Sequence, residues 1–240
     1  MFHARTTSAN ALRSVLAKVD DFAGLQWLIE RGRRTYRTDH MVYHWVNAPD
    51  GQIACGTYPA DWAVRYDTCG YQRIDPVVLA CANSFDPVDW KRLDWSRRQL
   101  RNFLAEAQAH GLSGQGLSLP IHGPNGEFAI LTANHGCSDE EWARFSAANS
   151  DQLHLLGHAI HGCARRILDR QPIALTDLSP READAMQLIA SGVDRQNAAR
   201  RLEISEHTLR DHLASARAKL GARNLHHAVA KAVAKGQIVI

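Results

Sequence analysis

Residues 203–221 read EISEHTLRDHLASARAKLG, and this stretch determines the fold of the C-terminal part of the chain. Four apolar residues follow one another at steps of four, three and four, which places them on one buried face of a helix: Leu209, Leu213, Ala216 and Leu220. Ser205 can cap the start of this helix, and Gly221 can close its end. A tight turn that leads into such a helix is typical of a helix-turn-helix unit.

A helix-start signature lies upstream of this unit, in Ser179-Pro180-Arg181-Glu182. The serine can cap, the proline suits the first helical position, and the glutamate can bond back to the cap residue. Further helices are predicted at about 195–202 and 225–235, which makes four short helices in all.

The composition changes before Ser179, and the segment 169–177 with its Pro172 is predicted to be a linker. We therefore expect a first domain over residues 1–168 and a four-helix, helix-turn-helix domain over residues 178–240.

All of the excess positive charge lies in the C-terminal part. Residues 171–240 contain ten Lys and Arg against seven Asp and Glu, which accounts for the whole net charge of +3. This excess permits nucleic-acid binding without proving it, since a small helical bundle also has a solvated, charged face. In a helix-turn-helix the third helix enters the major groove. We predict DNA contacts from His207, Thr208, Arg210, Arg217 and Lys219, with Arg210 suited to guanine and Thr208 and Lys219 to phosphates.

The composition of the whole chain is that of an ordinary globular protein, with 240 residues, 45% hydrophobic and 22% charged. No apolar run approaches the roughly 20 residues of a membrane-spanning helix, and the first residues do not read as a secretory signal. The five cysteines form no C-x-x-C pair. These features predict a cytoplasmic protein with reduced thiols, no membrane contact and no structural zinc.

The first domain mixes strand and helix patterns. Two pairs of strands are separated by turn signals, one at NAPDG and one at Pro124-Asn125-Gly126. The strands are expected at 41–46, 51–58, 116–123 and 127–134, and helical patterns occupy 11–32, 59–68, 73–82, 96–109 and 139–168. Hairpins without a repeating strand-helix alternation indicate an α+β fold, here an α/β/α sandwich with an antiparallel sheet.

A second informative stretch, YPADWAVRYDTCGYQRIDP at 58–76, carries Tyr58, Trp62 and Tyr66 four residues apart, with an Asp-Pro pair nine residues later. The aromatic residues could pack in a core, and Asp75 could simply cap the turn before Pro76. The same residues could also form the wall of a site that binds a small polar molecule.

The C-terminal domain resembles the helix-turn-helix domain of LuxR-type regulators. The residues that match this family's pattern are Ser179, Arg181, Glu182, Gly192, Ile204, Ser205, Thr208, His212, Lys219, Leu220 and Asn224. Val193-Asp194 stands where Lys-Thr is usual, which replaces a positive charge near the DNA by a negative one. Ala198 and Leu209 also depart from the usual Ile and Val. The resemblance implies DNA binding.

Two-component response regulators carry the same helix-turn-helix module. The first domain must therefore show whether the signal is phosphorylation or a small molecule. Asp20-Asp21 only superficially matches the acid pair of a receiver domain, and no doubly wound alternation follows it. The stretch at 58–76 instead resembles the autoinducer-binding domain of quorum-sensing LuxR-type proteins, which bind N-acyl-homoserine lactones. The matching residues are Tyr58, Trp62, Tyr66, Asp75, Pro76, Trp90, Gly116, Leu119-Pro120-Ile121 and Thr132.

The resemblance implies a role for each of these side chains. Asp75 would accept from the ligand's amide N–H, while Trp62 would donate to the lactone carbonyl and Tyr58 to the amide carbonyl. Thr132 would add a contact to the amide carbonyl or to the third acyl carbon's substituent. Tyr66 and Trp90 would be apolar walls, and Val77 would be a further ligand contact.

These observations predict a homodimeric, ligand-responsive transcription regulator that binds a palindromic promoter site in quorum sensing. RNA polymerase is a further partner that such a regulator could contact. The sequence predicts no cofactor and no catalytic residue. Three alternatives stay open: a regulator that senses a different small molecule, one gated by phosphorylation, and an enzyme. His154, His158, His161 and Cys163 could bind a metal, but we interpret them as a polar edge on a dimer-forming helix. Acyl length and the sign of regulation cannot be read from the sequence.

Overall fold

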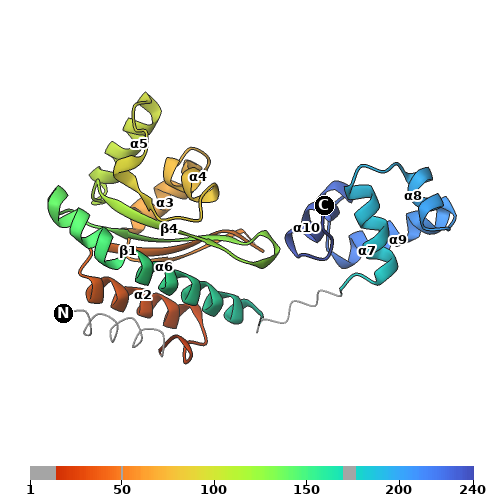
Figure 1. The fold of residues 1–240 in the computed structure, drawn as a ribbon, viewed down its shortest axis with the longest axis horizontal. Coiled ribbons are helices and arrows are strands. Elements are labelled where there is room, and N and C mark those ends of the chain that lie inside the picture. The colour runs from red at the N-terminus through yellow and green to blue at the C-terminus, as the bar shows by residue number, and fades with distance from the viewer. Residues whose placement is uncertain (1–14, 50, 170–176) are drawn as a thin grey trace. The chain divides into compact units, whose positions relative to one another are not determined.

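The computed structural model describes residues 15–49, 51–169 and 177–240, and the chain forms two compact units. The first unit contains a five-stranded sheet, and the second contains four helices (Figure 1). Among the described residues, no helix combines the length and apolar character that crossing a membrane requires.

The sheet is antiparallel throughout, with the strand order β2-β1-β5-β4-β3. Its strands are β1 (His40–Ala48), β2 (Gly51–Gly56), β3 (Val88–Asp89), β4 (Gly116–His122) and β5 (Phe128–Asn134). The two predicted hairpins are confirmed, although Asp50 of the first turn lies outside the described residues. The short strand β3 was not predicted. An antiparallel sheet is not the parallel, doubly wound sheet of a receiver domain, so the phosphorylation-gated alternative is wrong.

Helices cover both faces of this sheet (Figure 1). α2 (Phe22–Tyr36) and α6 (Asp139–Asp169) lie on one face, and α3 (Ala60–Thr68), α4 (Pro76–Ala82) and α5 (Arg98–Ala109) lie on the other. Single 3₁₀ turns stand at η1 (Tyr71–Arg73), η2 (Trp90–Arg92) and η3 (Pro124–Gly126). The predicted α/β/α sandwich is confirmed. The helix expected at 73–82 begins only at Pro76, because Asp75 caps it there, and residues 11–14 of the first predicted helical pattern lie outside the described residues.

Strand alternation separates a filled face of the sheet from a hollow one. Met41, Tyr43 and Trp45 of β1 enter the main core against α2 and α6, where they are almost completely buried. The intervening residues Val42 and His44 turn to the opposite face, toward α3, α4 and α5, and line a cavity there. The strand β1, which anchors the core, therefore also supplies part of one wall of the cavity.

The second unit consists of α7 (Pro180–Ala190), α8 (Arg195–Arg201), α9 (Glu206–Lys219) and α10 (Leu225–Ala234). Each helix begins with a side-chain cap, from Ser179, Asp194, Ser205 and Asn224 respectively. The predicted capping box is present, and the predicted stripe of α9 lies in the core of the unit. The tight turn before α9 places Glu203 in the left-handed region, at φ 56°.

A buried carboxylate ties the first helix of this unit to the third. Glu182 is only 5% exposed and accepts hydrogen bonds from Lys219 Nζ and Ser215 Oγ, both at 2.7 Å. Burial opposes ionisation, but the hydrogen bonds from Lys219, Ser215 and Ser179 outweigh it and lower the pKa of Glu182 from 4.5 to about 2. Ionised Glu182 therefore stabilises the folded unit.

We predict that Glu182→Gln lowers the free energy of unfolding of the second unit by about 1–3 kcal/mol at neutral pH, because Lys219 loses its charged partner. The folded pKa is depressed, so this contribution is present above pH 4.5 and disappears as the pH falls toward 2. Hydrogen exchange of peptides from α7 and α9 in the full chain measures the difference. The exposed Glu206→Gln is the matched control, and an equal destabilisation at every pH would contradict the assignment.

Candidate functional site

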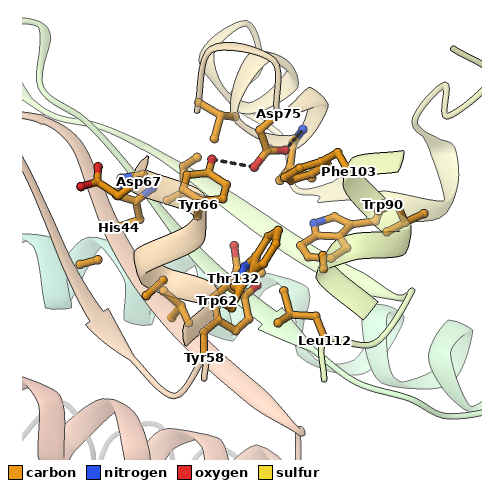
Figure 2. Close-up of a pocket in the computed structure, with 18 of the residues that line it drawn as sticks. His44, Tyr58, Trp62, Tyr66, Asp67, Asp75, Trp90, Phe103, Leu112 and Thr132 are labelled. Carbon is orange, nitrogen blue, oxygen red and sulfur yellow. Dashed lines mark hydrogen bonds between the residues drawn. The ribbon is translucent and has the colours of Figure 1, made fainter. Parts of the chain in front are cut away.

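A cavity of about 260 Å³ lies in the first unit between the sheet and the helices α3, α4 and α5 (Figure 2). The structure brings all seven sequence-predicted ligand residues to this one cavity: Tyr58, Trp62, Tyr66, Asp75, Val77, Trp90 and Thr132. They come from segments spread over most of the first unit, so their convergence is a property of the fold.

Asp75 lies at the centre of the cavity's polar wall and is 8% exposed. Its Oδ1 accepts from the backbone N–H of Val77 at 2.8 Å, which caps α4, and its Oδ2 accepts from Tyr66 Oη at 2.9 Å (Figure 2). The sequence left open whether Asp75 is a cap or a residue of the site's wall. The structure shows that it caps the helix and lines the cavity.

Burial sets the protonation of this wall. Burial raises the pKa of Asp75 from 3.8 to about 6, against the opposing effect of hydrogen bonds from Val77, Tyr66 and Val78. Burial, followed by the charge of Asp75, also raises the pKa of Tyr58 and of Tyr66 above the ordinary value of 10. At neutral pH the wall therefore presents one carboxylate and two phenols that keep their protons.

Tyr66 contributes more to the cavity than the apolar wall that the sequence predicted. Its ring lines the cavity, but its hydroxyl is the donor to Asp75 Oδ2. Sequence spacing could not show this, because the bond depends on where η1 places the aspartate relative to α3.

Trp90 presents its ring to the cavity and uses its N–H elsewhere. The indole donates to Ser118 Oγ at 2.9 Å, and Ser118 Oγ lies 2.8 Å from Thr132 Oγ1. A Cβ at Gly116 would stand 2.4 Å from the ring, so only glycine fits beside it. Thr132 is therefore tied into the sheet as well as exposed to the cavity.

Trp62 and Tyr58 have polar groups that the described part of the chain leaves unused. No described residue accepts a hydrogen bond from Trp62 Nε1 or from Tyr58 Oη, yet Trp62 is 3% exposed and both side chains line the cavity. Buried donors are normally satisfied. These two are thus available to acceptors on a bound molecule, beside the carboxylate of Asp75.

Several lining residues were not predicted. They come mainly from β1, β2 and α5: Val42, His44, Gln52, Ala54, Phe103, Leu104, Ala107 and Leu112. The alternation of β1 and β2 and the amphipathic pattern of α5 were available signals, but they do not say which face of the sheet is hollow.

The residues predicted to contact DNA lie on α9. His207, Arg210 and Arg217 are exposed, whereas Thr208 is partly buried and its Oγ1 lies 2.8 Å from Ser205 Oγ. Lys219 is paired with Glu182 at 2.7 Å, so the structure gives its ammonium a partner inside the unit. Its contact with phosphate stays a prediction.

The His-rich helix does not form a metal centre in the described residues, where no three His, Cys, Asp or Glu side chains gather suitably. His154 and His158 stack on each other at 5.2 Å, while His161 is buried and bonds Tyr43 Oη at 2.7 Å.

Comparison with known proteins identifies both units. The family model described as "Autoinducer binding domain" matches residues 22–164, and the one described as "Bacterial regulatory proteins, luxR family" matches residues 176–232. The chain belongs to the LuxR family of regulators. This LuxR-type chain is 34% identical to the transcriptional activator protein RaiR of Rhizobium etli over 68% of each chain. It is 29% identical to the quorum-sensing regulator RhlR of Pseudomonas aeruginosa over 95% of each chain.

Solved structures show the same fold. SdiA in complex with octanoyl-rac-glycerol matches with a TM-score of 0.73 at 22% identity, over 98% of this chain and 95% of that one. CepR2 from Burkholderia cenocepacia matches with a TM-score of 0.57 at 22% identity, over 70% of this chain and 99% of that one. The relatives are transcriptional regulators rather than enzymes, and this LuxR-type chain is an autoinducer-responsive, DNA-binding regulator.

We predict that Asp75→Asn stabilises the empty first unit at neutral pH. The folded pKa of Asp75 is raised, so ionisation of this group destabilises the fold progressively as the pH rises from 3.8 to about 6, and asparagine removes that effect. All six tryptophans lie in the first unit, so melting followed by their fluorescence reports on it.

The advantage of Asp75→Asn should shrink as the pH is lowered toward 3.8. The exposed Asp61→Asn on α3 serves as the control for a lost charge. A variant that melts below the unchanged protein at every pH would show that the capping role of Asp75 outweighs its burial.

Proposed function

We propose that this regulator binds an N-acyl-homoserine lactone in the cavity and, as a homodimer in the cytoplasm, binds a palindromic promoter site. One observation carries the proposal: the buried carboxylate of Asp75 lines the same cavity as two donors without a described partner, those of Trp62 and Tyr58. Such a wall is complementary to a molecule that offers one N–H and two carbonyl oxygens.

The chemistry of the lactone fits each group in turn. Its amide N–H would donate to Asp75, and a charged acceptor strengthens that bond. Its two carbonyls would accept from Trp62 Nε1 and Tyr58 Oη, which have no described partner. Val77 and Trp90, which also line the cavity, would supply apolar surface around them.

A second candidate ligand class follows from the structural comparison. SdiA was solved with octanoyl-rac-glycerol, an ester without an amide N–H. The hydroxyls of such an acylglycerol could also donate to Asp75, so this class supports the alternative of a regulator that senses a different small molecule. It should be included in every binding assay as a competitor.

Ligand binding would also stabilise the fold. Without a ligand, the buried carboxylate of Asp75 would lack a partner that offsets the cost of burying its charge. We propose that the ligand stabilises the first domain, residues 1–168, and through it the dimer. Residues 178–240 would then bind DNA and could contact RNA polymerase, and most of the predicted linker 169–177 lies outside the described residues.

We predict that Trp62→Phe and Tyr58→Phe each weaken lactone binding about 5- to 100-fold, because a ligand carbonyl is left without its donor. Asp75→Asn should weaken binding at least as much. Lactones that co-purify with protein expressed alongside candidate synthases, identified by mass spectrometry, provide the ligand for titration. Trp27→Phe, at a tryptophan 51% exposed, is the control. Unchanged affinity in the three cavity variants would exclude this binding mode.

We predict that Arg210→Ala weakens binding to the preferred DNA site about 5- to 150-fold and relaxes the choice of base at one position of each half-site. Arg217→Ala should weaken binding to all sequences more evenly. Selection from randomised duplexes by the full chain with its ligand, followed by titration at fixed salt, measures both. Arg98→Ala, exposed on α5 of the first unit, is the control. A selected site without two-fold symmetry would contradict the dimer.

A further inference from the structure

The end of the cavity formed by β1, β2 and α3 carries a chain of polar side chains. His44 Nε2 lies 2.9 Å from Gln52 Oε1, and Gln52 Nε2 donates to Asp67 Oδ1 at 2.6 Å. All three residues line the cavity, where His44 is partly buried and Gln52 and Asp67 are exposed. We call them the His44–Gln52–Asp67 chain, and neither the capping of a helix nor the binding wall at Asp75 requires it.

The direction of the bound ligand follows from the proposed function, on which this inference rests. Trp62, the donor for the lactone carbonyl, packs in one cluster with Phe103, Ala107 and Leu112, so the lactone ring lies at that end. The acyl chain must then leave Asp75 in the other direction. Figure 2 shows His44 and Asp67 on the side of the cavity away from Phe103 and Trp90, where the end of the acyl chain would arrive.

The hydrogen bonds within the His44–Gln52–Asp67 chain determine which of its polar atoms remain available to a ligand. Gln52 Oε1 can only accept, so His44 Nε2 carries the proton and His44 Nδ1 keeps a lone pair. Asp67 uses one carboxylate oxygen for Gln52 and keeps the other. No described residue donates to His44 Nδ1 or to Asp67 Oδ2. Burial lowers the pKa of His44, which keeps its ring neutral and its Nδ1 an acceptor at neutral pH.

We propose that this end of the cavity selects an acyl chain that carries a hydroxyl at its far end. The groups left available are acceptors, and a terminal hydroxyl is a donor of the right kind for them. A plain alkyl end would displace water from these groups without replacing its hydrogen bonds, which is unfavourable. The His44–Gln52–Asp67 chain is thus a specificity determinant for the tail, separate from the wall that binds the head group.

The test compares two series of homoserine lactones, from butanoyl to decanoyl, with plain and with ω-hydroxy chains. Affinity for the full chain is measured by titration. We expect the ω-hydroxy lactone to bind about 3- to 10-fold more tightly than the plain lactone at the chain length that reaches His44. Plain lactones that bind equally well or better at every length would overturn the inference and leave the proposed function intact.

Variants of the cavity residues test whether the His44–Gln52–Asp67 chain causes the preference for ω-hydroxy lactones. Gln52→Leu and His44→Leu should each abolish it or reverse it toward plain chains, and retained binding of plain chains shows that the variants are folded. Gln108→Leu makes the same change at an exposed residue outside the cavity lining and should keep the preference. A preference that survives in both cavity variants would overturn the inference. If no lactone of either series binds the unchanged protein, the proposed function is wrong, and the inference is wrong with it.

Discussion

The carboxylate of Asp75 is held in place by the helix that follows it, and the ligand cavity depends on this constraint. Pro76 occupies the first helical position, and Asp75 Oδ1 caps α4 through the N–H of Val77. The carboxylate cannot rotate toward a ligand without uncapping the helix that carries Val77 and Val78 in the cavity wall. In the proposed binding mode, a ligand would have to bring its donor to a fixed acceptor, which would favour molecules of one geometry.

The sheet explains why a cavity exists beside such a firm core. β1 fills the face against α2 and α6 with the large side chains of Met41, Tyr43 and Trp45. On the cavity face β1 presents Val42 and His44, and β5 presents Ile130 and Thr132. The packed face holds the strands in register. The opposite face of the sheet therefore keeps its shape although its side chains line the cavity without filling it.

Local signals in the sequence were sufficient for most of the elements and for seven of the residues that line the cavity. Tyr58, Trp62 and Asp75 line one cavity, and the apolar stripe of α9 lies in the core of the second unit. Contacts between side chains of different elements could not be predicted, because they depend on tertiary placement. The bond from Tyr66 to Asp75 and the pair of Lys219 with Glu182 are of this kind. The two residues of β3 are too few for any periodicity to mark them.

The two units differ in how fully their buried polar groups are hydrogen-bonded, and this difference limits how a ligand can act. In the second unit every helix is capped, and its buried carboxylate is fully bonded, so its fold needs no outside partner. The first unit keeps unused donors and a destabilised carboxylate around a cavity. A ligand present at about a hundred times its Kd would add about 2.7 kcal/mol to the unfolding free energy of that unit alone. Under the proposed function, control of DNA binding would therefore act on helix-turn-helix units that are already folded.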